Sequence, residues 1–192
     1  MEVNKVYSFI LSPGDAVKRD IRNFKTFCRH VIGSYPSLFS KAHVTICEPY
    51  PERKEVMLRM IHRLMHDLQQ LPAAKIKLNG FKYFVNADGK YVIYVSLELN
   101  AHLKLWFQKL RLELGDKSNG IPHITIARGI SATQFKTLWP HFENFSYQRT
   151  FTVKQLTILK SDIIKAGPHE VYKEIPFGNA DTELKAVWTL FG

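Results

Sequence analysis

Two histidines in this sequence open the same short pattern. His43 begins a His-Val-Thr-Ile tetrapeptide, and His123 begins a His-Ile-Thr-Ile tetrapeptide. Imidazole has a pKa near 6.5, so at neutral pH one histidine of a pair can accept a proton while the other, kept cationic by a nearby phosphate, donates one. Two such groups in one site predict metal-free general acid/base chemistry on a phosphodiester.

The spacing inside each tetrapeptide suits a strand with two different faces. Side chains alternate along a strand, so we expect His43 and Thr45 to share one face, His123 and Thr125 to do the same, and the intervening aliphatic residues to enter the core. Threonine hydroxyls can donate to phosphate oxygens. Arg128, shortly after the second motif, can bind the same phosphate through its guanidinium, or it can be a surface charge at a strand end.

The segments that must position these residues repeat one order of elements. A β-prone stretch, Tyr7–Ser12, leads through a helix to His43, and Tyr91–Ser96 leads through another helix to His123. Apolar residues recur in both helices at steps of three and four, which indicates one buried face. These residues are Val17, Ile21, Phe24, Cys28 and Val31 in the first helix, and Leu103, Trp106, Phe107, Leu110 and Leu114 in the second. We expect Lys18, Arg19, Arg22 and Lys25 on the opposite, solvated face of the first helix.

Further helices and strands follow each motif. We expect helices near 53–71 and 132–142, and strands near 150–159 and 171–177. A hairpin should join 75–85 to 91–97 through Asp88-Gly89, a dipeptide typical of tight turns. This pattern predicts an α+β fold with two pseudo-symmetric lobes, each an antiparallel sheet with helices on its outer face, around a central cleft. We assign one domain to 1–192, with an internal repeat of roughly 5–90 and 91–177 and a tail at 178–192.

The composition favours an anionic partner. The chain has 192 residues, a formal charge of +10 and a pI of about 9.6, and positive charge of this size attracts phosphates. The start of the sequence lacks the pattern of a signal peptide and no apolar run has the length of a membrane span, so we expect a cytoplasmic monomer without membrane contact. Cys28 and Cys47 show no metal-binding spacing, and a disulfide between them is not expected.

Other residues allow alternatives. His62 and His66 have the spacing of a metal-chelating helix, but no third ligand is evident, and we expect no metal and no cofactor. The basic helix residues are solvated faces or track an RNA strand. Tyr50, Tyr83 and Phe84 could stack a base, although most aromatic residues must be core.

The paired motifs resemble those of the 2H phosphoesterase superfamily, and in particular its bacterial 2′-5′ RNA ligase-like branch, also described as RNA 2′,3′-cyclic phosphodiesterases. Arg128 and the stretches 80–86 and 172–177 also look like that branch, and the resemblance runs from Tyr7 to about Phe177. It implies RNA or a nucleotide with a 2′,3′-cyclic phosphate as partner, and opening of that ring to a 2′-phosphate or transfer that creates a 2′-5′ linkage.

Within that resemblance, His123 is assigned as the base that activates water and His43 as the acid that protonates the 3′ oxygen, with the roles exchanged in the ligating direction. The chain departs from the pattern at 47–50 and in its tail, and we expect Glu48 to face away from the phosphate. Two alternatives stay open: a non-catalytic module that binds RNA or a nucleotide in a basic cleft, and an esterase of a different phosphodiester such as a cyclic ADP-ribose derivative.

Overall fold

The computed structural model describes residues 5–116, 118, 120–162 and 169–178, apart from the side chains of residues 48 and 50. The tail beyond Gly178, the expected orientation of Glu48 and the side chain of Tyr50 therefore lie outside the described part. The described strands are β1 (Lys5–Leu11), β2 (Val44–Glu52), β3 (Ala74–Val85), β4 (Tyr91–Leu97), β5 (His123–Ile130), β6 (Gln148–Val153), β7 (Gln155–Asp162) and β8 (Glu170–Pro176). The helices are α1 (Asp15–Ile32), α2 (Lys54–Asp67), the short 3-10 helix η1 (Leu68–Gln70), α3 (Ala101–Glu113), α4 (Ala132–Leu138) and α5 (Pro140–Glu143).

All eight of these strands form one antiparallel sheet, in the order β6-β3-β4-β5-β2-β1-β7-β8. Two four-stranded halves meet between β5 and β2, where Val44 opposite Ile124 is the one strand pair between them in the described residues. The order reads the same from either edge when β1 is exchanged with β4, β2 with β5, β3 with β7 and β6 with β8. The α+β fold with two lobes that the sequence predicts is therefore confirmed. The two lobes are the two halves of one sheet, and we call the β5–β2 contact that joins them the waist.

Each half of the sheet takes strands from both ends of the chain. β3 leaves the N-terminal part to join β4, and β7 and β8 return from the C-terminal part to join β1. The expected strand at 150–159 is consequently two strands, because the chain passes from one half of the sheet to the other around Lys154. The expected hairpin between β3 and β4 is confirmed, and Gly89 supplies the positive φ of +76° in its turn.

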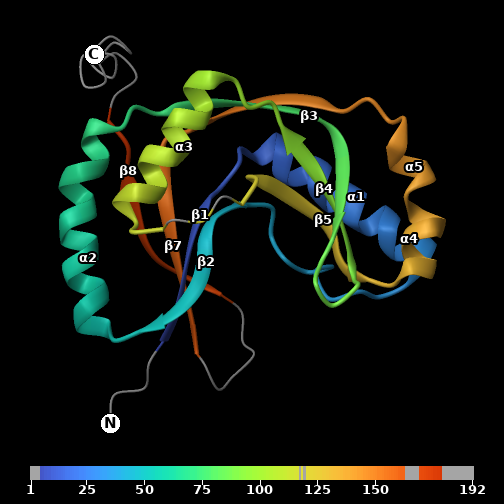
Figure 1. Cartoon of the computed structure of the whole chain (residues 1–192), viewed down its shortest axis with the longest axis horizontal. Helices are drawn as coiled ribbons and strands as arrows, with labels where there is room; N and C mark the ends of the chain where they lie inside the picture. Colours follow the sequence, from blue (N-terminus) through green and yellow to red (C-terminus); the bar gives the residue numbers. More distant parts are fainter. Residues whose placement is uncertain (1–4, 117, 119, 163–168, 179–192) are drawn as a thin grey trace.

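Helices cover both halves, and they cross over between them (Figure 1). α1 follows β1 in the chain but packs on β5 beside α4, whereas α3 follows β4 but packs on β2 as well as on β3. Figure 1 accordingly shows α2 and α3 at one end of the molecule and α1, α4 and α5 at the other. The helix expected at 132–142 is broken into α4 and α5 at Pro140, whose ring cannot continue a helix hydrogen-bond ladder.

The sequence prediction for one helix residue is wrong. Lys25 was assigned to the solvated face of α1, but its side chain is buried with only 4% exposure, in line with Ile21 and Cys28. Its ammonium group donates to the carbonyl oxygens of Ser37 and Ser40 at 2.8 and 2.9 Å and to the Ser40 hydroxyl at 2.7 Å. Three acceptors compensate for the loss of water, so a cation is tolerated within the apolar stripe.

Candidate active site

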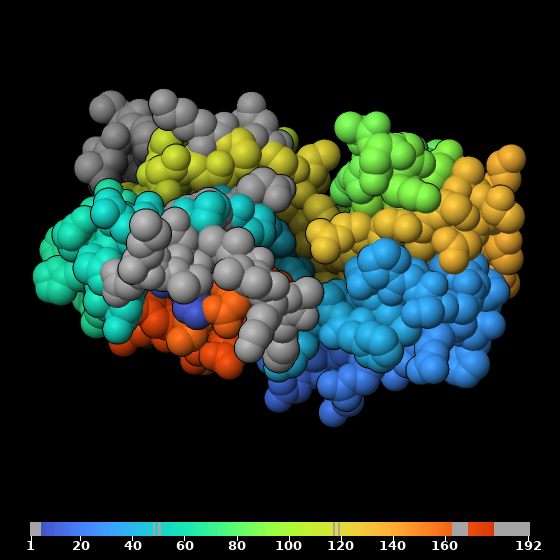
Figure 2. All heavy atoms as spheres, turned by 90° about the horizontal axis from the view of Figure 1, so that it is seen from below, coloured from blue at the N-terminus to red at the C-terminus, as the bar shows by residue number. Residues whose placement is uncertain are grey.

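The two His-x-Thr motifs lie on the strands that meet at the waist. Val44, Ile46, Ile124 and Ile126 are all 0–1% exposed, while the two histidines and the two threonines between them are only partly buried. The alternation expected from the sequence is therefore present in both motifs. The side chains of all four polar residues emerge from one side of the sheet. Figure 2 shows the molecule as two bulky ends with a recessed waist on the face it presents.

The antiparallel register brings the two motifs into one site. Continuing the Val44–Ile124 pair by one residue in each direction sets His43 across from Thr125 and Thr45 across from His123. Residues directly opposite in such a pair have Cβ atoms about 5 Å apart, and diagonal neighbours are about 7–8 Å apart. The two imidazoles are diagonal neighbours, which leaves room for one phosphate between them, with a threonine hydroxyl beside each ring.

Both imidazoles are held in the same way by their own backbone. Nδ1 of His43 lies 2.7 Å from the carbonyl oxygen of Lys41, and Nδ1 of His123 lies 2.8 Å from the carbonyl oxygen of Ile121. A carbonyl oxygen only accepts, so Nδ1 must carry the proton in each ring. In its neutral form each ring therefore has its basic lone pair on Nε2, and in its cationic form each ring carries a proton on Nε2.

A β-bulge sets the direction of Arg128. β5 pairs Thr125 with Tyr94 but Ala127 with Ile93, so the register skips Ile126. The extra residue reverses the alternation, and Arg128, paired with Val92, returns to the face that carries Thr125. β2 has the same shift, because Thr45 pairs with Ile10 and Cys47 with Phe9.

The surroundings of His43 are cationic. Burial lowers the pKa of His43 below its usual value, the positive charges of Lys25, Arg128 and His169 lower it further, and the hydrogen bond to Lys41 opposes them. Arg128 is thus close enough to His43 for their charges to interact. An anion bound between these groups would be attracted by all of them.

The surroundings of His123 are aromatic. Its ring centroid lies 4.8 Å from that of Tyr94 and 5.5 Å from that of Phe84, with interplanar angles of 51° and 75°. Tyr94 is almost fully buried, whereas Phe84 is 38% exposed at the edge of the site. The two histidines therefore share one backbone geometry but lie in chemically different environments.

A polar network that the motifs did not reveal supports the cationic side. The Ser37 hydroxyl accepts from the backbone N–H of Arg128 at 2.8 Å, while the Ser37 carbonyl accepts from Lys25. The Tyr35 hydroxyl donates to the carbonyls of Lys25 and Ile126, at 3.3 Å in both cases. The loop before His43 is thus tied to the strand that carries the second motif. The position of Lys25 at i+4 from Ile21 and i−3 from Cys28 is the sequence signal that would have found it.

The other residues considered from the sequence lie elsewhere. His62 and His66 are on α2, away from both motifs. Throughout the described residues, no three His, Cys, Asp or Glu side chains gather where they could hold a metal. Cys28 and Cys47 are buried and are not joined by a disulfide, and burial raises the pKa of Cys28 to about 12. No helix in the described part of the chain is long and apolar enough to cross a membrane.

A two-lobed sheet with paired His-x-Thr strands at its waist defines a class of protein, and comparison with known proteins agrees with it. A family profile described as the 2′-5′ RNA ligase superfamily matches residues 13–163. The chain belongs to this superfamily of 2H phosphoesterases. Among curated protein sequences, none matches the chain significantly.

Solved structures share the fold at low sequence identity. TT0787 of Thermus thermophilus is 20% identical with a TM-score of 0.68, over 91% of this chain and 99% of that one. E. coli LigT complexed with 3′-AMP is 13% identical with a TM-score of 0.64, over 91% and 98%. Usb1 of Kluyveromyces marxianus is 13% identical with a TM-score of 0.53, over 91% and 99%.

Proposed function

We propose that the protein is a metal-independent phosphodiesterase that opens 2′,3′-cyclic phosphates at the ends of RNA or on nucleotides, and that it forms a 2′-5′ linkage where a 5′-hydroxyl replaces water as the nucleophile. The observation that carries the proposal is the matched pair of imidazoles. Each has Nδ1 tied to a carbonyl two residues earlier, which leaves Nε2 of each ring as the atom that can exchange a proton with a bound phosphodiester. A module that only binds phosphate needs positive charge, but it has no use for two proton-transfer groups at equivalent positions.

In the proposed reaction, the Nε2 atom of neutral His123 takes a proton from water as the water oxygen forms a bond to phosphorus. The bond from phosphorus to the 3′ oxygen breaks, and Nε2 of cationic His43 gives that oxygen its proton. A 2′-phosphate results. Thr45, Thr125 and Arg128 hold the non-bridging oxygens, whose negative charge increases in the transition state. In ligation a 5′-hydroxyl takes the place of water and the ring opens in the same direction, so the two histidines keep these roles. The exchange of roles expected from the sequence applies instead to cleavage of a 2′-5′ linkage, which is the reverse of ligation.

The environment of His43 is compatible with its role as the acid once substrate is bound. In the free protein its pKa is lowered by burial and by neighbouring cations. A phosphodiester anion placed beside it offsets those cations and raises the pKa, so His43 takes up a proton as the substrate binds. A cationic donor is thereby formed only when a phosphate is present to be cleaved.

The donor set also supports a mechanism without a metal. Two imidazoles and two hydroxyls make a poor zinc site, because catalytic zinc usually has three nitrogen, sulfur or oxygen ligands from the protein. Nucleoside 2′,3′-cyclic phosphates should therefore be hydrolysed in the presence of EDTA.

The test compares wild type, His43→Ala and His123→Ala in EDTA, with His30→Ala as the control because His30 is an exposed histidine on α1. We expect turnover by wild type and the control, and loss of turnover with retained phosphate binding in the two site variants. If wild type binds RNA without turnover of any cyclic phosphate, and both site variants bind equally well, the protein is a binding module instead. Turnover of a cyclic ADP-ribose derivative alone would assign a different phosphodiester.

A further inference from the structure

The loops that precede the two histidines are each held by a buried or nearly buried cation from the preceding helix. Lys25 of α1 donates to the carbonyl of Ser40, and Arg111 of α3 donates through Nη2 to the carbonyl of Gly120. Ser40 and Gly120 stand three residues before His43 and His123, respectively. The two cations therefore bind equivalent carbonyls.

A second pair of equivalent carbonyls is also bound, in each case by a residue of the other sequence repeat. The bulged residues Ile46 and Ile126 stand three residues after each histidine. Nε of Arg111 donates to the Ile46 carbonyl at 3.1 Å, and the Tyr35 hydroxyl donates to the Ile126 carbonyl. Arg111 alone binds both a carbonyl before one histidine and a carbonyl after the other. In the other half of the site, Lys25 binds the first kind of carbonyl and Tyr35 binds the second.

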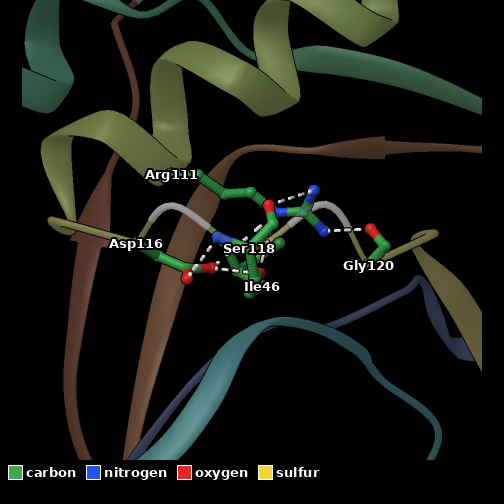
Figure 3. A network of polar contacts seen from close by, with 5 residues as sticks. All are labelled: Ile46, Arg111, Asp116, Ser118 and Gly120. Atoms are coloured by element: carbon green, nitrogen blue, oxygen red, sulfur yellow. Dashed lines mark hydrogen bonds and ion pairs between the residues drawn. The ribbon is translucent and has the colours of Figure 1, made fainter.

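Figure 3 shows Arg111 together with Ile46 and Gly120, whose carbonyls it binds. Its guanidinium also lies 3.4 Å from the carbonyl of Ser118 through Nη1 and 3.9 Å from a carboxylate oxygen of Asp116. That carboxylate accepts from the backbone N–H and hydroxyl of Ser118 at 2.9 and 2.7 Å. The Arg111 side chain is 11% exposed, so these contacts are largely shielded from water.

We propose that Arg111 is a positioning residue of the active site, and that Lys25 with Tyr35 is its counterpart in the other half. Two pairs of equivalent carbonyls are bound, and within each pair the side chains that bind them differ. What both halves require is therefore a fixed backbone position and not a particular residue type. This inference rests on the function proposed above, because a displaced imidazole matters only if it transfers protons.

The connection to the chemistry runs through the loop backbone. The Ile121 carbonyl orients the His123 ring and is the neighbour of the Gly120 carbonyl that Arg111 holds. Reaction geometry must be held to about 0.5 Å, and a misplacement of about 1 Å can cost about 100-fold in rate. Because Arg111 also holds Ile46 on the opposite strand, it fixes the two rings relative to each other.

Arg111→Lys is the informative change, because it keeps the charge but cannot span Ile46 and Gly120 at once. We expect kcat to fall about 10- to 100-fold with KM changed less than about threefold. Lys104→Met, on the exposed face of α3, is the matched control and should leave kcat unchanged. Tyr35→Phe removes one hydroxyl from the opposite half and should also lower kcat rather than raise KM.

Two readouts separate positioning from ordinary stabilisation. Millimolar guanidinium should restore part of the kcat of Arg111→Ala, and methylammonium should restore less, because only the former has the planar fork of donors with which Arg111 holds the Ile46 and Gly120 carbonyls. NMR signals of both the His43 and His123 imidazoles should shift in Arg111→Lys and stay fixed in Lys104→Met. The NMR readout needs no turnover, so it tests this inference even if wild type hydrolyses no cyclic phosphate, which would refute only the proposed function. Unchanged imidazole signals, or a loss of kcat that simply follows thermal stability, would overturn the positioning role.

Discussion

The two halves of the site have the same backbone and different neighbours. Both histidines donate through Nδ1 to the carbonyl two residues earlier, and both are followed by a threonine and a one-residue bulge. Around His43 the neighbours are the cations Lys25, Arg128 and His169, whereas around His123 they are the rings of Tyr94 and Phe84.

The shared backbone geometry is what proton transfer at a phosphate requires, and the different neighbours are what make the two histidines distinct. In the proposed reaction phosphorus lies between two symmetric proton-transfer groups, so the shared backbone geometry would serve either direction of the reaction. Charge on one side and aromatic surface on the other distinguish the two histidines. The cations are suited to the phosphate, and the exposed edge of Phe84 is suited to a flat group attached to it.

The largest expected effect comes from removing either imidazole, and it can show which one is the acid. We expect His43→Ala and His123→Ala each to lose about 10²- to 10⁴-fold in kcat on a cyclic phosphate. A p-nitrophenyl phosphodiester has a leaving group that needs no proton. On that substrate His43→Ala should recover most of the lost rate, and His123→Ala should not. Recovery by His123→Ala alone would reverse the assignment, and equal losses on both substrates would remove the distinction.

The next effect tests the cationic side. Arg128→Met removes a charged hydrogen-bond donor, and such bonds contribute about 1.5–3 kcal/mol, so we expect kcat/KM to fall about 10- to 150-fold. Arg128→Lys should lose less, because it keeps the charge without the fork of donors. Arg59→Met, an equal change of charge on the exposed face of α2, is the control. If Arg128→Met and Arg59→Met have equal activity, Arg128 is only a surface charge.

The sequence predicted the face of the motif residues but could not predict the face of Arg128. In an unbroken strand Arg128 would share the face of Ile124 and Ile126, behind the sheet. The bulge at Ile126 reverses that, and nothing in the local composition marks it, because the extra residue is defined by the register with Tyr94 and Ile93 on another strand. Arg128 is therefore a candidate because of its place shortly after the second motif and because of the resemblance, and not because of periodicity.

Arg111 and Lys25 were missed for a related reason. Lysine and arginine are rarely buried without partners, so a helix pattern assigns them to solvent. Their acceptors here are backbone carbonyls such as those of Ser40, Gly120 and Ile46, and a carbonyl has no sequence signature. The secondary structure is easier to predict from the sequence, because most strands and helices follow from apolar periodicity. The passage of the chain between the sheet halves around Lys154 is not predictable in this way, because it depends on long-range strand pairing.

A smaller effect should test the aromatic side. Phe84→Leu removes an exposed ring beside His123, and stacking of a base on an aromatic side chain contributes about 1–3 kcal/mol. We expect KM for a nucleoside 2′,3′-cyclic phosphate to rise about fivefold, which corresponds to the lower end of that range. Glycerol cyclic phosphate has no base, so its KM should not change.

Tyr83→Leu is the matched control for this change. Tyr83 is the preceding residue of the same strand, but its ring packs against Phe135 and Trp139 on the helix side of the sheet. It should affect stability without changing KM. Equal rises in KM for the nucleotide and for glycerol cyclic phosphate in Phe84→Leu would show that the ring shapes the histidine environment and does not contact a base.

The smallest expected effect is the uptake of a proton by His43 when a phosphodiester binds. The pKa of His43 lies below its usual value in the free protein, and a bound phosphodiester anion should raise it. Between those two values the complex holds more protons than the separate components, so affinity should fall as the pH rises through that window. A phosphodiester monoanion does not titrate there, which leaves the protein as the source of the change.

His123→Ala allows this linkage to be measured with intact substrate, because the variant should bind without turnover. Calorimetry in two buffers with different ionisation enthalpies should show uptake of a fraction of a proton in the window and none well above it. His43→Gln combined with His123→Ala should abolish the uptake. If uptake persists without His43, the proton enters at another group, and substrate binding does not charge His43.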